Sequence, residues 1–273
     1  MYPKNLTKER LRNGARVFGI SLAEMRSLAL PRILAGMGYD FLFFDMEHSP
    51  DGFETTCDLV WASRTAGITP IVRVPDAERF FISRILDAGA QGVIVPRVET
   101  VEQVDAIVGF CRYPPDGDRG VALGGRHTDF QPIGDPHTAM KQANDEVLVS
   151  IQIETRLGLQ HVQELAARPG VDVLFVGPQD LSVALDVPNQ WEAPVMNDAI
   201  RRVVDAAERS GVVVGIQGRN PELASRWMAE GIRFVVMGTT LMLLTEAARN
   251  GVNELRKRSD AIDAEPYHVP AKS

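Results

Sequence analysis

The sequence predicts an α/β fold, a single-domain (β/α)8 TIM barrel. Short runs rich in Val, Ile and Phe recur along the chain, and each run is followed by a longer segment with helical spacing. Eight such pairs occur over roughly 230 residues, which matches the usual size of a (β/α)8 barrel, about 250 residues. A doubly wound open sheet is the alternative, because periodicity alone does not close a barrel. Against it, the first strand-to-helix turn, GISLAEM, lacks the GxGxxG pattern of a dinucleotide-binding sheet.

The expected strands are short and mostly apolar, as parallel strands covered on both faces are. Helical segments between them include ERFFISRILDAGA, TVEQVDAIVGFCR, RLGLQHVQELAARPG and MNDAIRRVVDAAERSG. Glycine comes just before the next strand in AGMG, TAG, DAGA, RSG and AEG, where a helix C-cap belongs. In chain order the strands are expected at residues 16–20, 40–45, 69–74, 92–96, 147–154, 171–177, 212–216 and 233–238.

Two segments fall outside this alternation. Residues 113–141 are dense in Gly and Pro, and a connection of that length in a compact domain is typical of a functional or mobile loop. Residues 259–273 have no core pattern and are expected to form an arm or a disordered tail. The predicted organisation is therefore one barrel over residues 1–258 and a tail over residues 259–273.

Composition narrows the class of protein. The chain has 273 residues, of which 45% are hydrophobic, enough to bury a large core. Its net charge is -7, so a broad basic surface is absent and nucleic acid is not a predicted partner. The polar N-terminus and the lack of any apolar run near ~18 residues predict a cytoplasmic protein with no membrane partner. The two cysteines, Cys57 and Cys111, lie in helical patterns and are expected to be reduced.

Polar residues gather at the carboxyl ends of four expected strands, the end at which TIM barrels place their chemistry. In FLFFDMEHSP, for example, an apolar strand breaks into two acids and a histidine. All these residues are expected on one rim of the barrel. They are Asp45, Glu47 and His48 at strand two, Arg73 at strand three, Gln152 and Glu154 at strand five, and Gly177, Pro178, Gln179 and Asp180 at strand six.

Glu154 and Asp180 form a candidate metal site. They follow two successive strands, and neighbouring parallel strands lie about 4.8 Å apart, so both carboxylates can reach one cation. Ligands that are all oxygen, with room for water, suit Mg2+ or Mn2+ rather than zinc. The alternative is structural, with Glu154 capping the following helix and Asp180 acting as an N-cap.

His48 and Arg73 are candidates for a base and a fixed cation. The neighbouring acids can tune His48 toward the proton affinity of a general base; the alternative is a loop histidine hydrogen-bonded for structure. Arg73 can hold a carboxylate or stabilise an enolate, or else form a rim ion pair with an acid. The start of VGPQDLS adds backbone N–H groups for a small anion. Together these residues indicate a metal-assisted lyase or isomerase for a carboxylate substrate, and the absence of a lysine at a strand end argues against a Schiff base.

Six motifs, in order between about residues 15 and 250, resemble those of the class II, metal-dependent pyruvate aldolases of the HpcH/HpaI type, typified by 4-hydroxy-2-oxoheptanedioate aldolase. They are DMEHSP, VRVP, ILDAGAQGVIVPRVET, RYPPDGDRGV, QIET and VGPQDLS. The resemblance implies a lyase that reversibly cleaves a 4-hydroxy-2-oxo acid to pyruvate, or a related 2-oxo acid, and an aldehyde. It also implies a divalent metal cofactor, Mg2+, Mn2+ or Co2+.

The resemblance also implies roles for the rim residues. Glu154 and Asp180 would be the metal ligands, Arg73 would contact the keto oxygen, and His48 would be the base. Lining and supporting roles would fall to Gln152, Gly177, Pro178 and Gln179 around pyruvate, to Glu47 near the water ligands of the metal, and to Asp45 in keeping the rim ordered.

Asp87 matches the family's partner for the catalytic histidine, yet it lies near the end of the helix between strands three and four. That position is at the bottom of its own barrel, so the rim that it reaches would belong to a neighbouring subunit. The resemblance implies a homohexamer, a trimer of dimers that exchange their last helix. The segment LMLLTEAARNGVNELRK is apolar enough for that exchange and equally for ordinary core packing.

Two segments depart from the family pattern: GGRHTDF at 124–130 and GIQGRN at 215–220. Both border the aldehyde side of the site, so the resemblance does not identify the acceptor. Two other functions stay open. One is a related carbon-carbon enzyme with the same site, of the citrate-synthase or oxaloacetate-using kind; the other is a barrel that has lost catalysis and serves for binding or assembly.

Overall fold

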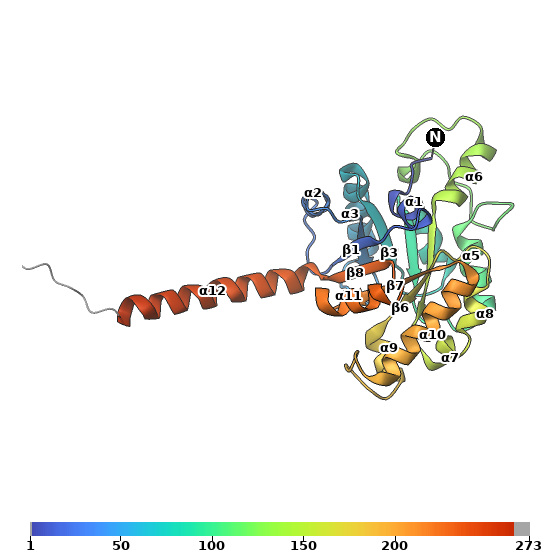
Figure 1. The fold of residues 1–273 in the computed structure, drawn as a ribbon. Coiled ribbons are helices and arrows are strands. Elements are labelled where there is room, and N and C mark those ends of the chain that lie inside the picture. Colours follow the sequence, from blue (N-terminus) through green and yellow to red (C-terminus); the bar gives the residue numbers. More distant parts are fainter. Residues whose placement is uncertain (1, 265–273) are drawn as a thin grey trace, which may run out of the picture.

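The computed structural model describes residues 2–264, in which eight parallel strands form a closed barrel (Figure 1). Each strand pairs with the next, and the ring closes where Val17 of the first strand lies opposite Phe234 of the last. This pairing rules out the open doubly wound sheet and confirms the predicted barrel. The strands are β1 (Val17–Leu22), β2 (Phe41–Asp45), β3 (Thr69–Arg73), β4 (Gly92–Val95), β5 (Leu148–Ile153), β6 (Val173–Val176), β7 (Val213–Gly218) and β8 (Phe234–Thr239).

Helices surround this ring, and several of them end at the predicted glycines. Gly67 and Gly211 adopt left-handed φ angles of 75° and 70° directly after α3 and α10, which confirms those C-caps. The predicted helix from residue 156 is instead two short helices, broken at His161. The helices are α1 (Leu6–Arg12), α2 (Leu30–Gly36), α3 (Phe53–Ala66), α4 (Arg79–Asp87), α5 (Val101–Cys111), α6 (Pro136–Glu146), α7 (Arg156–Gln160), α8 (Val162–Ala166), α9 (Pro178–Ala184), α10 (Pro194–Ser210), α11 (Pro221–Ala229) and α12 (Thr240–Ala264).

Aromatic rings fill the inside of the barrel. Phe41 stacks on Phe234 with ring centroids 4.2 Å apart. Gly19 makes room for this pair, because a Cβ at that position would overlap the Phe41 ring. Aliphatic side chains on the outer face of the strands pack beneath the helices. Most polar groups therefore lie at the two ends of the barrel; Ser150, buried in the middle of β5, is an exception.

The connection predicted over residues 113–141 is shorter than expected, because α6 begins at Pro136. Asp135 caps this helix, and its side chain accepts a hydrogen bond from the Thr138 N–H over 2.8 Å. Proline suits the first position of a helix, where its missing N–H has no intrahelical partner. The remaining loop contains one 3-10 turn, Arg126–Thr128.

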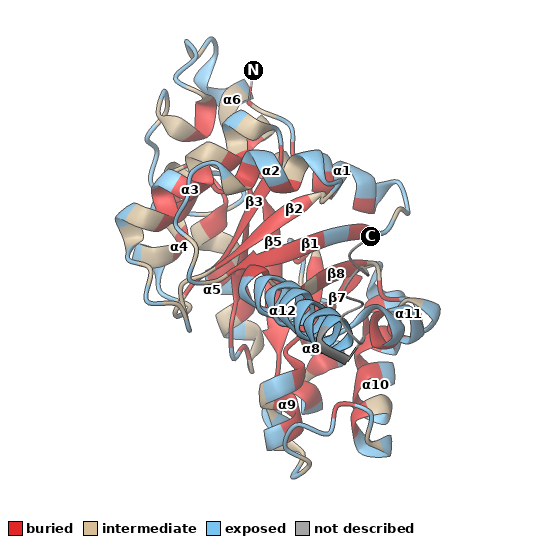
Figure 2. Ribbon diagram, turned by 90° about the vertical axis from the view of Figure 1, so that its left-hand side faces the viewer, coloured by how far each residue is buried: buried red, intermediate tan, exposed pale blue. Residues whose placement is uncertain are grey.

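α12 extends away from the barrel instead of packing on it (Figure 1). Residues 241–262 of the helix are exposed, and Figure 2 shows them beside the buried strands. Ordinary core packing of this segment is therefore not observed. α12 continues past residue 258, where the tail was predicted to begin, to Ala264; the rest of the predicted tail, 265–273, lies outside the described residues. No helix within 2–264 is long and apolar enough to cross a membrane.

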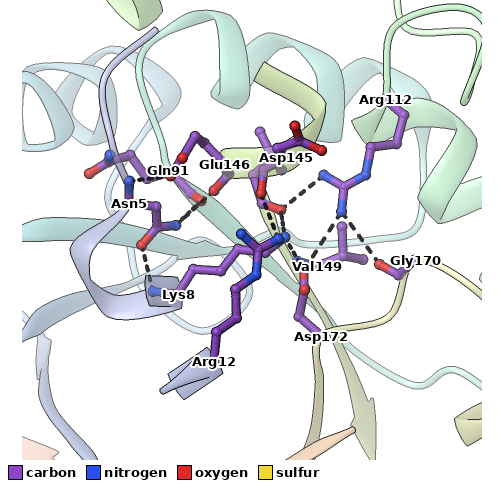
Figure 3. Close-up of polar contacts among 11 residues, drawn as sticks. Asn5, Lys8, Arg12, Gln91, Arg112, Asp145, Glu146, Val149, Gly170 and Asp172 are labelled. Atoms are coloured by element: carbon purple, nitrogen blue, oxygen red, sulfur yellow. Dashed lines mark hydrogen bonds and ion pairs between the residues drawn. The ribbon is translucent and has the colours of Figure 1, made fainter. Parts of the chain in front are cut away.

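α1, which was not predicted, closes the bottom of the barrel, where the strands begin. Lys8 is buried there, and its Nζ donates to the Val147 carbonyl oxygen over 2.6 Å and to Asp172 Oδ2 over 2.8 Å (Figure 3). Arg112 lies 3.6 Å from the same carboxylate. Burial lowers the pKa of Lys8 to about 8, against the opposing attraction of Asp172.

Lys8 should make the stability of the protein depend on pH. Below about pH 8 it is protonated in the folded and the unfolded chain, so the cost of burying its charge is fully present. Between pH 8 and 10.5, the ordinary pKa of lysine, Lys8 binds more protons in the unfolded chain than in the folded chain. The contribution of Lys8 to the free energy of unfolding therefore rises with pH in this range. We expect the free energy of unfolding of the wild type, relative to Lys8→Met, to rise by about 2 kcal/mol across this range in urea titrations.

Lys4→Met is the matched control for this measurement. Lys4 belongs to the same segment, but its side chain is exposed, so its replacement should give no comparable rise. A difference between wild type and Lys8→Met that stays flat with pH would contradict the lowered pKa of Lys8.

Candidate active site

Arg73 and Asp45 form a bidentate pair at the carboxyl ends of β3 and β2, where they are paired in register. Arg73 Nε donates to Asp45 Oδ1 over 2.9 Å and Nη2 donates to Oδ2 over 2.5 Å. Nη1 lies 3.1 Å from Glu47 Oε2, without the alignment of a hydrogen bond. The ion pair considered for Arg73 is thus present, and Asp45 orients the guanidinium.

The two acids beside Arg73 respond differently to burial. Burial alone would raise the pKa of Asp45, but the hydrogen bonds and charge of Arg73 lower it below its usual value. Burial raises the pKa of Glu47; Arg73 opposes this rise, whereas the charges of Asp45 and Asp180 add to it. The surroundings therefore stabilise the charged form of Asp45 and destabilise the charged form of Glu47.

Glu154 follows β5 and is only 3% exposed. Its Oε1 accepts a hydrogen bond from the Arg97 backbone N–H over 2.8 Å, and its Oε2 accepts one from Gln152 Nε2. Burial raises the pKa of Glu154, and the charges of Asp180 and Glu47 raise it further. The three carboxylates thus repel one another at the same place.

Neither metal-ligand candidate caps a helix, so the alternative considered for both is wrong. Thr155 is the N-cap of α7, and its side chain accepts a hydrogen bond from the Gly158 N–H. Gly177 is the N-cap residue of α9, and Asp180 lies in the first turn of that helix. The carboxylates of Glu154 and Asp180 are therefore available for another role.

The oxygens around these carboxylates fit a hydrated divalent cation. Glu47 Oε2 and Gln152 Oε1 are buried acceptors without a hydrogen-bond donor in the described part of the chain. Together with Glu154 and Asp180 they make a set of oxygens with excess negative charge, which suits Mg2+ or Mn2+. Residues 2–264 contain no cluster of three or more His, Cys, Asp or Glu side chains that could hold a metal. Waters or substrate oxygens would have to complete the coordination.

His48 lies on the open side of the rim, with its side chain 61% exposed and Nε2 3.8 Å from Glu47 Oε2. The turn before it is ordered, because Asp45 Oδ1 accepts hydrogen bonds from the backbone N–H groups of Glu47 and His48 over 3.0 and 3.2 Å. Within 2–264 no hydrogen bond holds the imidazole itself, so a purely structural role for this histidine is not observed. Its ring is accessible to a substrate.

Asp87 is the predicted site residue that lies away from this rim, at the end of α4. Arg119 Nη2 donates to Asp87 Oδ1 over 2.6 Å; Arg119 is fully buried, whereas the Asp87 side chain is 35% exposed. Three further polar atoms are buried and have no hydrogen-bond partner in the described residues. They are the hydroxyls of Tyr2 and Tyr113 and the Nε2 of His127. A buried guanidinium thus holds Asp87 at the surface. Sequence reasoning missed Arg119, although it belongs to the motif RYPPDGDRGV.

Two other arginines near the rim were missed. Arg97 adopts a left-handed φ of 55°, and this conformation is sparsely populated outside glycine. It directs its backbone N–H to Glu154. Arg219 lies on the loop after β7, inside the segment GIQGRN, whose unusual polarity was the available signal.

Gly177 leaves the space that Glu154 and Gln152 occupy. Its φ of -91° suits any residue, but a Cβ would lie 2.5 Å from Glu154 Oε2 and 2.6 Å from Gln152 Nε2. We expect Gly177→Ala to displace both side chains, to lower the free energy of unfolding by about 1 to 3 kcal/mol, and to weaken Mn2+ binding in isothermal titration calorimetry.

Gly36→Ala is the matched control, since a Cβ there meets nothing within 4 Å. It adds the same methyl group to α2 and should leave both stability and Mn2+ binding close to wild type. Wild-type Mn2+ affinity in Gly177→Ala would contradict a cation site at Glu154.

The chain is similar in sequence and in fold to known aldolases and to a citrate synthase. The HpcH/HpaI aldolase/citrate lyase family matches residues 23–247. A hydroxypyruvate/pyruvate aldolase of Paraburkholderia phytofirmans is 35% identical over 258 residues, covering 92% of this chain and 98% of the relative. The crystal structure of an HpcH/HpaI aldolase from Desulfitobacterium hafniense has a TM-score of 0.86 at 30% identity and covers 96% of this chain and 98% of that one. The citrate synthase SbnG has a TM-score of 0.83 at 29% identity and covers 93% and 98%.

Proposed function

Because the chain belongs to the HpcH/HpaI aldolase/citrate lyase family and is a carbon-carbon lyase, we propose that it is a divalent-metal-dependent aldolase. It would reversibly cleave a 4-hydroxy-2-oxo acid to pyruvate, or a related 2-oxo acid, and an aldehyde. The observation that carries this proposal is the cluster of mutually repelling carboxylates with raised pKa values, Glu47 and Glu154, beside the buried cation Arg73. A cation that joins such a cluster would lower the cost of keeping its carboxylates charged.

The buried residues would handle the 2-oxo acid. Glu154 and Asp180 would hold Mg2+, Mn2+ or Co2+, which supplies a Lewis acid when bound. Arg73, fixed by Asp45, would donate from Nη1 to the keto oxygen and stabilise the negative charge that develops as the enolate forms. Gln152, together with the chain from Gly177 to Gln179, would line the pyruvate half of the site.

His48 would move the proton. In the cleavage direction its imidazole would take the proton of the substrate 4-hydroxyl as the carbon-carbon bond breaks, and in the addition direction it would return that proton. Glu47 Oε2 lies 3.8 Å from Nε2, so a carboxylate stands beside the ring that would carry this proton. The exposure of the ring allows an aldehyde to reach it from solvent.

Exchange of the methyl protons of pyruvate with deuterium tests this function. A site that forms the enolate exchanges these protons without any aldehyde, and proton NMR in D2O follows the loss of signal. We expect exchange with Mg2+, Mn2+ or Co2+, loss of exchange when EDTA removes the metal, and recovery when metal is restored. No exchange with any of the three ions would sink the aldolase assignment.

A second candidate keeps the site and changes the donor. The likeness to the citrate synthase SbnG supports testing oxaloacetate, and the likeness to the aldolase of Paraburkholderia phytofirmans supports testing hydroxypyruvate. Substituting each for pyruvate in assays of addition to one aldehyde would rank the three donors by kcat/KM. A barrel that only binds or assembles would consume none of them.

We further propose that the protein is a homo-oligomer, a hexamer built from dimers that exchange α12. Phe18 faces outward from β1 and is exposed, where a barrel helix would ordinarily cover it. The exposed apolar residues of α12 recur with helical spacing and would be covered by a second copy of the chain; they include Leu241, Leu244, Val252, Leu255 and Ile262. Asp87 would then be available to the His48 of a neighbouring subunit.

A further inference from the structure

Arg219 is a cation at the rim that pairs with no acid in the part of the chain that the structure describes. Its guanidinium carbon lies 3.8 Å from the centre of the Trp191 ring, and its Nη2 donates to Gln179 Oε1 over 3.4 Å and to Asn189 Oδ1. These partners are an indole and two amides, and no carboxylate of residues 2–264 forms an ion pair with it. The guanidinium is therefore held in place while its charge stays uncompensated.

The register of β7 places Arg219 at the carboxyl end of the barrel, directly after the strand. Gly215 lies inside, where a Cβ would come within 2.9 Å of Phe175 Cδ2, and it is paired with Phe175. Side chains alternate along a strand, so Gln217 also faces the interior, beside Gly177. Arg219 is two residues further, past the end of the strand. It is exposed and hydrogen-bonded to Gln179, two residues from Gly177, so it lies on the same rim.

Depth separates the two ends of the site. Glu154 is 3% exposed and Arg73 is 8% exposed, so the reacting carbon atoms, which must meet these groups, bind at the buried end. Arg219 is exposed. A short 2-oxo acid held at the buried end would leave this outer cation unused, so the part of a substrate that extends from the buried end toward solvent is the part that would meet Arg219.

We propose that Arg219 binds an anionic group, a carboxylate or a phosphate, at the far end of the aldehyde acceptor. This inference rests on the proposed aldolase function. An arginine stacked on an indole presents a planar fork of N–H groups that matches such an oxyanion. The positive groups at the buried end, Arg73 and the proposed cation, would be taken up by the 2-oxo acid, so a second anionic group is left to Arg219. The acceptor is thereby oriented with its aldehyde inward.

The experiment compares the addition of pyruvate to matched aldehydes by the full-length protein with Mn2+. Succinic semialdehyde is paired with butanal, and glyceraldehyde 3-phosphate with glyceraldehyde, so that the pairs report carboxylate and phosphate separately. We expect kcat/KM to favour at least one anionic aldehyde over its neutral counterpart. Arg219→Gln should lower that preference by about 10- to 100-fold, mainly through KM.

Two further variants sharpen the comparison. Arg219→Lys keeps the charge but loses the planar fork, so it should retain part of the preference. Arg16→Gln removes an exposed arginine at the opposite end of the barrel and should leave the preference unchanged. Because Arg219 is exposed, the wild-type preference should also weaken as salt is added.

Pyruvate proton exchange without an aldehyde keeps the two proposals distinguishable. Equal losses on charged and neutral aldehydes in Arg219→Gln, or no preference in the wild type, would overturn the role of Arg219. A loss of exchange as large as the loss of addition would assign Arg219 to the 2-oxo acid and overturn it as well. Absence of exchange in the wild type would remove the aldolase function, and the inference with it.

Discussion

Glu154→Gln is expected to lower metal-dependent exchange of pyruvate protons by about 1,000-fold or more. The substitution preserves the shape of the side chain but removes the charge that would bind the cation. A Lewis acid contributes several kcal/mol to stabilising developing negative charge, and each 1.36 kcal/mol corresponds to a factor of ten in rate.

The same variant should be no less stable than the wild type when metal is absent. Burial and the neighbouring acids raise the pKa of Glu154, so its charged form is disfavoured in the folded protein. Glutamine removes that charge. Gln152 can turn its amide so that Oε1, which has no partner in the described structure, accepts a hydrogen bond from the new amide. The Arg97 N–H keeps an oxygen acceptor.

Thermal unfolding with and without Mn2+ measures both effects. The wild type should gain stability as Mn2+ is added, since a ligand that binds only the folded state stabilises it, and Glu154→Gln should not. Glu102→Gln, at an exposed acid in the first turn of α5, is the control and should behave as the wild type does. Unaltered stabilisation by Mn2+ in Glu154→Gln would contradict this metal site.

Mixing two inactive variants, His48→Ala and Asp87→Asn, should restore aldolase activity. His48 lies on the rim and Asp87 at the opposite end of the same barrel, so one subunit cannot bring them together. Loss of a general base lowers the rate by about 100- to 10,000-fold. In randomly mixed oligomers, about a quarter of the shared sites would contain both native residues, and activity would recover to that fraction.

The choice of asparagine protects the fold in this experiment. Arg119 is fully buried, and asparagine keeps an oxygen to accept its hydrogen bond, whereas alanine would leave a buried charge unpaired. Mixing His48→Ala with Glu154→Gln is the control, because both residues belong to the same rim and no complete site can form. Co-purification of an untagged variant with an affinity-tagged one confirms that mixed oligomers are present. No recovery in mixed oligomers of His48→Ala and Asp87→Asn would rule out a site shared in this way.

Much of the fold could be predicted from the sequence, because its signals are local. Parallel strands covered on both faces must be apolar, and helices that end before them need a residue tolerant of positive φ, as Gly67 and Gly211 show. Once eight strands are counted, the barrel sends their carboxyl ends to one rim. The gathering of Asp45, Arg73 and Glu154 follows from that alone.

Two helical segments, the start of α6 and residues 259–264, were not predicted although neighbouring residues in the sequence carry the signal for them. Pro136 lies in a segment that was predicted to be a loop because it is rich in glycine and proline. Asp135, directly before it, is a residue that commonly caps a helix, and it caps α6. α1 was missed because Lys8 reads as a surface residue. Its burial depends on Asp172, which is far away in sequence.

The sequence by itself determined the eight alternating strands and helices and most of the polar groups at the carboxyl ends of the strands, because strand periodicity and chain order suffice for both. Closure of the ring came from the pairing of the first strand with the last, which no local pattern shows. Only the tertiary structure decided what those groups do to one another. It tied Asp45 to Arg73, left Glu47, Glu154 and Asp180 in mutual repulsion, and set Arg219 over Trp191 without an acid. Charge and burial depend on contacts between distant strands, and no local pattern in the chain encodes those distances.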